Sequence, residues 1–265
     1  MQDWFIWNGV DSRTMGIVVS KPAPVVYPAE RVEQVTVPGR RGFLTRTEGE
    51  GVFDGYLKTI TIGNRRAADP HGIAAWLRGQ GELILGNEPN RVYFGRIIKE
   101  ASLERLMRDA YQGPISWMVQ PEKGQYPPES ATVWEPSGTG DVGSVTLYNP
   151  GDLPAAPRIT VYATGLAGAG PMITLGIGDE ALGDGSPARI QADLTARTAA
   201  DGCVIDLDAM AVTTLDGAES LDASVTVYGA EDAIHLAPGE ETVISIDRTT
   251  ASVTRLSIEP RWRWL

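Results

Sequence analysis

The chain has 265 residues, of which 42% are hydrophobic and 22% charged, so it can bury a sizeable core in one or two domains. Its single cysteine, Cys203, excludes an internal disulfide framework, and its two histidines, His71 and His235, are too few for a three-histidine metal site. The net charge is −11, but residues 1–128 hold 16 basic and 14 acidic side chains, whereas residues 129–265 hold 7 and 20. Because an acidic surface repels nucleic acid and anionic membranes, we expect no sequence-specific nucleic-acid partner and no membrane partner.

The 30 glycines and 18 prolines separate short runs rich in Val, Ile, Thr, Tyr and Trp, a pattern typical of an all-β protein with many turns. The first run, residues 4–7, ends at Asn8-Gly9, which is the strongest short hairpin signal. Residues 16–20 are expected to form the returning strand of that hairpin. The next strands are expected at 32–37 and 56–62.

One segment, 69–78, breaks the strand pattern and predicts a single short helix. Asp69 is a suitable N-cap, Pro70 suits the first helical position, and Gly79 suits the stop at the C-terminal end. Three apolar residues share one face of this helix: Ile73, Trp76 and Leu77. We therefore expect one helix lying over a sheet.

Strands then resume, and a segment rich in proline and glycine, residues 120–141, predicts a boundary between two domains, 1–128 and 129–265. Residues 101–110 fit either a helical turn or a charged strand, and the pattern does not separate the two. Before the boundary, strands are expected at 82–85, 91–98 and 113–119. After it, they are expected at 144–148, 158–162, 172–177, 203–207, 223–228, 242–246 and 252–258. Their spacing predicts a β-sandwich.

No motif in the chain predicts catalysis. The glycine-rich segment 165–170 lacks the following helix that a phosphate-binding loop requires, because Pro171 and another strand come next. Asp206 and Asp208 share one face of a strand, as a glycosidase pair could, but a solvated strand face explains them better. His235 precedes a turn without a recognisable nucleophile nearby. We expect no enzymatic activity, no catalytic residues, no cofactor and no metal.

Aromatic and arginine side chains gather near both ends of the chain. The segment Arg261 to Leu265 (RWRWL) alternates the two types, which fits stacking on single-stranded nucleic acid but fits a core or subunit contact better. Adjacent arginines in a glycine turn, Arg40 and Arg41, fit either a partner contact or a solvated turn.

A set of short motifs, taken in order, resembles the distal tail protein family of long-tailed, non-contractile phages. The motifs are FIWNG (5–9), VPGRRG (37–42), WLRGQGEL (76–83), RVYFG (91–95), ISWMVQP (115–121), LYNPG (147–151) and LAPGE (236–240). They run through nearly the whole chain in the order of the family. The chain departs from the family at Glu240-Glu241, where an asparagine is common, and in its glycine-rich insertion at 165–187.

The resemblance implies an N-terminal split-barrel-like β domain with one helix and a C-terminal galectin-like β-sandwich. In some members of the family the last strand returns to the N-terminal domain, and residues 257–265 are the candidate for that strand here. Such a protein forms a hexameric ring in the virion, at the tail tip or baseplate, after synthesis in the host cytoplasm. The ring joins the major tail (tube) protein to the tail-associated hub, fibre or adhesion device and leaves a channel for DNA. Tape measure and receptor-binding proteins are further neighbours.

Candidate contact residues for such a ring are aromatic and arginine side chains, although some of them must lie in the core instead. They are Trp4, Trp7, Arg40, Arg41, Trp76, Trp117, Trp262 and Trp264. The alternative function is a carbohydrate-binding module that contacts glycans on the host cell surface. Against that alternative, residues 150–250 contain only Tyr162 and Tyr228 as aromatic residues for stacking on sugars.

Overall fold

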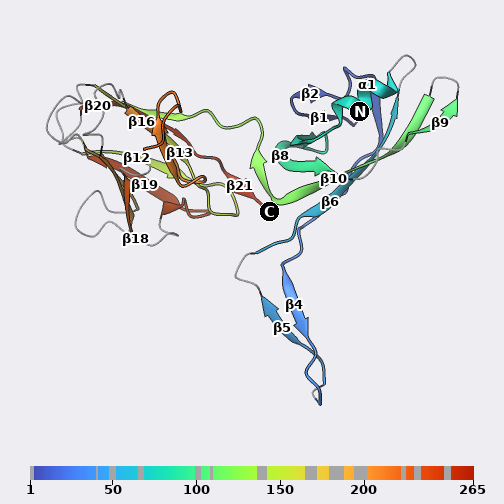
Figure 1. The fold of residues 1–265 in the computed structure, drawn as a ribbon, viewed down its shortest axis with the longest axis horizontal. Coiled ribbons are helices and arrows are strands. Elements are labelled where there is room, and N and C mark those ends of the chain that lie inside the picture. The colour runs from blue at the N-terminus through green and yellow to red at the C-terminus, as the bar shows by residue number, and fades with distance from the viewer. Residues whose placement is uncertain are drawn as a thin grey trace. The chain divides into compact units, whose positions relative to one another are not determined.

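The computed structural model describes residues 3–39, 41–47, 52–64, 69–98, 103–107, 110–135, 142–164, 172–178, 188–193, 202–221, 225–229, 234–247 and 252–265. These residues are nearly all strand and turn, with one helix, which confirms the expected all-β class. The chain forms two compact units, Met1–Pro127 together with Leu265, and Pro128–Trp264. Each unit is described below by itself (Figure 1).

The N-terminal unit is built on one antiparallel sheet that curls into a half-barrel. Its strands are β1 (Phe5–Trp7), β2 (Val10–Asp11), β3 (Ile17–Lys21), β6 (Tyr56–Asn64), β7 (Gln80–Leu85), β8 (Glu88–Ile97), β9 (Glu104–Met107) and β10 (Ala110–Gln125). The strand order is β2-β1-β7-β8-β10-β6-β3, and β9 pairs with β10. Residues 104–107 are a strand, so of the two alternatives for 101–110 the charged strand is correct for this described part.

The Asn8-Gly9 turn is formed as expected, with positive φ at both residues (49° and 76°). Its returning strand is the two-residue β2, however, and not residues 16–20. Residues 17–21 form β3, which pairs with the distant β6. The expected hairpin partner was wrong because an alternating apolar pattern marks a strand without identifying its neighbour. At the same turn, Asn8 accepts a hydrogen bond from the Glu82 N–H at 3.0 Å.

The helix α1 (Pro70–Trp76) begins at the predicted cap. The Asp69 carboxylate accepts hydrogen bonds from the main-chain N–H groups of His71 and Gly72, each at 3.0 Å. The helix ends at Trp76, before the predicted stop at Gly79, which has a φ of +87°. Its buried face, at Ile73, packs into the core of the N-terminal unit.

A separate hairpin of β4 (Val32–Val35) and β5 (Leu44–Thr47) leaves this sheet between β3 and β6 (blue in Figure 1). Among the described residues, these two strands pair only with each other. The base of the hairpin is closed by two main-chain hydrogen bonds, from Arg31 to Val52 and from Asp54 to Ala29, and by the Arg31–Asp54 ion pair. We call this hairpin with its base, 29–31 and 52–54, the arm.

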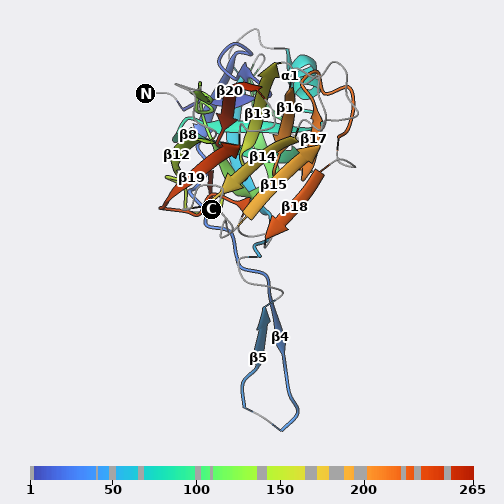
Figure 2. The same ribbon diagram turned by 90° about the vertical axis from the view of Figure 1, so that its left-hand side faces the viewer.

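The C-terminal unit is a sandwich of two five-stranded antiparallel sheets. One has the order β11 (Thr132–Trp134), β20 (Ser252–Glu259), β13 (Arg158–Thr164), β16 (Gly202–Asp206) and β17 (Ala211–Thr214). The other has the order β12 (Val142–Tyr148), β19 (Glu241–Asp247), β14 (Met172–Ile177), β15 (Ala188–Asp193) and β18 (Val225–Gly229), and β21 (Arg263–Trp264) comes last in the chain. Figure 2 shows β19, β14, β15 and β18 side by side in front of β20, β13 and β16.

The core of the sandwich consists of alternate, inward-facing aliphatic residues from both sheets, such as Ile159 and Leu256 from one and Leu175 and Ile244 from the other. The edge of this core needs a glycine. A Cβ at Gly143 would lie 2.1 Å from the ring of Trp134, so the indole can lie against β12 only because that side chain is missing.

Candidate functional site

Two of the candidate contact residues lie in the core of the N-terminal unit. Trp7 on β1 and Trp117 on β10 are both 0% exposed, with ring centroids 6.0 Å apart, and Phe5 packs edge-on against Trp117. Neither indole N–H has a hydrogen-bond partner among the described residues. These two tryptophans hold the curled sheet together, and their side chains offer no surface to another molecule.

Trp76, at the end of α1, joins the helix to that core. Its ring stacks on Phe5 at 5.5 Å and its indole N–H donates to the Trp7 carbonyl at 3.2 Å. The side chain is partly exposed. It can therefore contribute both to the packing of α1 and to a surface next to the helix.

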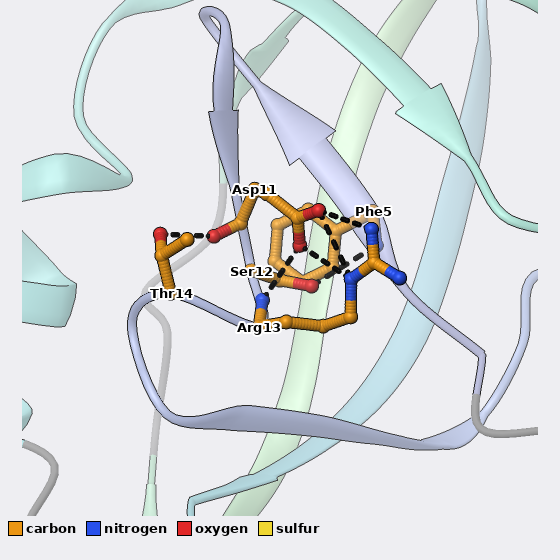
Figure 3. A network of polar contacts seen from close by, with 5 residues as sticks. All are labelled: Phe5, Asp11, Ser12, Arg13 and Thr14. Atoms are coloured by element: carbon orange, nitrogen blue, oxygen red, sulfur yellow. Dashed lines mark hydrogen bonds and ion pairs between the residues drawn. The ribbon is translucent and has the colours of Figure 1, made fainter.

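Trp4 lies near Arg13, which belongs to a loop between β2 and β3. Figure 3 shows the hydrogen bonds that order this loop. Asp11 accepts hydrogen bonds from the main-chain N–H of Arg13 at 2.8 Å and from its guanidinium, and these bonds lower the pKa of the Asp11 carboxyl. Ser12 accepts from the Phe5 N–H at 3.1 Å, and Thr14 donates to the Asp11 carbonyl. The Arg13 guanidinium then lies 5.1 Å from the Trp4 ring, so this half-buried indole and cation form one ordered surface.

Arg41 is exposed and lies in the arm, whereas Arg40 lies outside the described residues. The arm also exposes four large apolar side chains by 39–56%: Val32, Val35, Phe43 and Leu44. Every arm residue from 32 to 46 that the structure describes is exposed except the partly buried Val37. A two-stranded hairpin without a core is marginally stable in water, so the arm has the character of a segment that packs against another molecule.

The sequence predicted a strand at 32–37, and the adjacent arginines pointed to the turn of this hairpin. It did not predict that the apolar residues of the arm are exposed, because a run of apolar and polar residues does not show whether another sheet covers it.

The terminal segment, residues 261–264, is held to the rest of the C-terminal unit by a series of polar contacts. Arg261 makes a bidentate ion pair with Asp206, at 2.8 and 3.0 Å, and Arg263 contacts Asp208 at 2.6 Å. The Trp262 indole, which is buried, donates to Glu129. Trp264, half-buried, packs against the sandwich core.

These contacts explain the pair of aspartates that a glycosidase could have used. Burial raises the pKa of Asp206, but the hydrogen bonds from Arg261 and from two main-chain N–H groups outweigh burial, so the pKa lies below its ordinary value. A general acid needs the opposite shift. Asp206 and Asp208 therefore serve as ion-pair partners of the terminal arginines.

The remaining groups that could carry chemistry are placed as follows. Cys203 is buried on β16, and burial raises the pKa of its thiol to about 12, so it is not a nucleophile at neutral pH. No group of three or more candidate metal ligands comes together within the described ranges. The glycine-rich segment 165–170 lies outside them. The part of the chain that the structure describes contains no helix with the length and hydropathy of a membrane span.

One of the two aromatic residues considered for sugar stacking, Tyr162, is not an open platform. The guanidinium of Arg255 covers the ring of Tyr162, 3.9 Å from its centroid. The side chain of Tyr228 lies outside the described side chains.

Comparison with known proteins places the fold. No protein-family model matches the chain, and no curated protein matches it. Its structure is similar to the crystal structure of the Dit (gp 19.1) protein of phage SPP1, described as a paradigm of the hub adsorption apparatus in phages that infect Gram-positive bacteria. The similarity has a TM-score of 0.63 at 16% sequence identity and covers 99% of each chain. The fold is therefore that of a Dit protein over its whole length.

Proposed function

We propose that this chain is a structural, non-enzymatic hub at the tail tip or baseplate of a long, non-contractile phage tail. In this proposal six copies form a ring with a channel for DNA. The ring joins the tail tube protein to the tail-associated hub, fibre or adhesion device. The single observation that carries the proposal is the likeness to the SPP1 Dit protein, which extends over 99% of both chains and so includes both units.

The arm supports self-association as the basis of the proposed ring. It carries apolar residues that are exposed in the single chain, and such residues gain stability when another surface covers them. A closed ring uses two different surfaces on each copy, so that the arm of one copy packs on a second surface of the next. The ordered surface of Trp4 and Arg13 is a candidate for that second surface, because it combines an indole with a fixed cation.

The test is light scattering on the purified chain combined with negative-stain images of the same peak. We expect a particle with six times the monomer mass and a central hole. A double variant, Val35→Asp with Leu44→Asp, places two charges in the exposed apolar pair of the arm and should give monomers. The matched control is Val133→Asp, because Val133 is also an exposed valine on a strand, in the C-terminal unit.

The proposal would be contradicted by a chain that remains monomeric alone and also in the presence of a tail tube protein. A ring that forms equally well from the native chain and from the Val35→Asp, Leu44→Asp variant would contradict the role given to the arm. A glycan-array signal that is lost on Tyr162→Ala would favour the carbohydrate-binding alternative.

A further inference from the structure

A buried polar cluster lies in the N-terminal unit, outside every surface described so far. Lys58 on β6 is 0% exposed and Lys123 on β10 is 5% exposed. Both ammonium groups lie near the ring of Tyr93 on β8, that of Lys58 at 4.7 Å and that of Lys123 at 5.7 Å from its centroid. The Tyr93 hydroxyl donates to Glu88, which also forms an ion pair with Lys58 at 3.0 Å.

The cluster contains more positive than negative charge, which is costly inside a protein unless each ammonium has acceptors. Burial lowers the pKa of Lys58, while Glu88 opposes that shift. Burial raises the pKa of Glu88, but the hydrogen bonds from Tyr93 and Lys58 outweigh it and the pKa falls below its ordinary value. Both shifts show how strongly these groups depend on one another.

The remaining acceptors of the two ammonium groups come from outside the sheet. Lys58 donates to the main-chain oxygen of Pro24 at 2.8 Å, and next to it Asn87 donates to the Ala23 carbonyl at 2.9 Å. Lys123 donates to the main-chain oxygen of Leu265 at 2.7 Å and also lies 5.8 Å from the ring of Tyr27. Residues 23–27 lead directly into the arm, and Leu265 directly follows the last residue of the C-terminal unit.

We infer that the Lys58–Glu88–Tyr93–Lys123 cluster couples two contacts. One holds residues 23–27, which lead into the arm, and the other holds Leu265. Lys123 contacts Leu265 and Tyr27 at the same time. When Leu265 moves away from Lys123, the Lys123 ammonium loses the hydrogen-bond acceptor that the described residues give it. A buried ammonium without an acceptor then turns toward solvent. Its contact with Tyr27 is then lost, and the chain leading into the arm is held less firmly. Linkage requires that the coupling operates equally in the opposite direction.

This inference goes beyond the proposed function, because the coupling acts within one chain whether or not a ring forms. Its value to a ring-forming protein would be the order of assembly, because the arm becomes fixed in direction only when Leu265 is bound to Lys123.

The test is amide hydrogen exchange on the full chain and on a variant that ends at Trp264, compared in the same oligomeric state. The reporters are the N–H groups of Arg31 and Asp54, which close the base of the arm. We expect their exchange to become about two- to fivefold faster, the range expected from losing one partly buried cation–π contact. Amides of the paired residues Ile60 and Ile115 serve as internal controls for an intact sheet and should not change.

The reverse direction is tested by Tyr27→Ala, with amide hydrogen exchange at Leu265 as the readout. Tyr27 is exposed, so the substitution leaves the core intact, and Tyr148→Ala, at an exposed tyrosine of the C-terminal unit, is the matched control. Exchange at Leu265 should be faster in Tyr27→Ala than in Tyr148→Ala. Equal exchange at Leu265 in these two variants, or equal exchange at Arg31 and Asp54 with and without Leu265, would overturn the coupling.

Discussion

The sheet and the arm of the N-terminal unit use similar residue types for opposite purposes. In the sheet, aromatic residues such as Phe5, Trp7 and Trp117 are fully buried and contact one another. In the arm, Phe43 and Leu44 are exposed and the hairpin has no core of its own. A large apolar residue therefore indicates an interface with another molecule only when it is exposed in the folded single chain. In this chain the degree of burial separates core residues from candidate contact residues, and the residue type alone does not.

The largest expected effect is at the centre of the sheet. Trp117→Ala should lower the free energy of unfolding by about 3–5 kcal/mol, because it leaves a large cavity in a closed core. Trp117→Phe should cost less, since it keeps part of the volume and removes an indole N–H that has no partner among the described residues. Urea titration measures both. Equal losses from the two variants would show that the cavity is not the cause.

An intermediate effect is expected at the ion pair of the terminal segment. Asp206→Asn should cost about 1.5 kcal/mol at neutral pH, because a half-buried, bidentate contact with Arg261 is lost. The folded state lowers the pKa of Asp206, so its stabilisation is present above the unfolded pKa near ~4 and is lost as pH falls through the folded value. The native chain should therefore lose more stability between pH 7 and strongly acidic pH than the variant. Parallel pH profiles would contradict this assignment.

A smaller effect is expected at the exposed cap of the helix. Asp69→Ala should cost about 1 kcal/mol, because the N–H groups of His71 and Gly72 lose their acceptor. Asp69→Ser, which keeps a capping oxygen, should restore most of the loss. Thermal unfolding of the two variants makes the comparison, and a Ser variant no better than Ala would exclude capping as the reason.

The smallest effect is expected in the arm. Leu44→Ala should change the free energy of unfolding of the monomer by less than about 0.5 kcal/mol, although leucine is as apolar as the core residues. The same variant should weaken the proposed ring. A loss of several kcal/mol in the monomer would show that the arm is covered within its own chain and would remove the contrast with the sheet.

Local signals in the sequence predicted local structure well. Asp69 and Pro70 located the start of α1, and Asn8-Gly9 located the first hairpin turn. The extent of β10 was not predicted, because Pro121 and Gly124 indicated a boundary while the strand continues to Gln125. Pro121 lies where the pairing with β8 shifts register, and a Cβ at Gly124 would lie 2.9 Å from Val92. Both residues are thus compatible with a strand for reasons that only its neighbours reveal.

Strand pairing and side-chain burial depend on residues that are distant in the sequence. For this reason they were not predicted from the sequence. β3 pairs with β6, although residues 22–55, which include the arm, lie between the two strands in the sequence. A lysine in a strand, such as Lys58, looks like a solvent-facing residue until Glu88 and Pro24 are seen beside it. The candidate contact set mixed core and surface residues for the same reason, because tryptophan is common in both places.

Because Cys203 is buried, a cysteine introduced elsewhere in the chain can be labelled selectively. Since the Cys203 thiol is enclosed on β16 and holds its proton well above neutral pH, it should not react with maleimides or form disulfides between copies. A cysteine introduced at an exposed site such as Phe43 would then be the sole reactive thiol of the chain. A dye or spin label at that position could follow the arm during assembly without any change to the native cysteine.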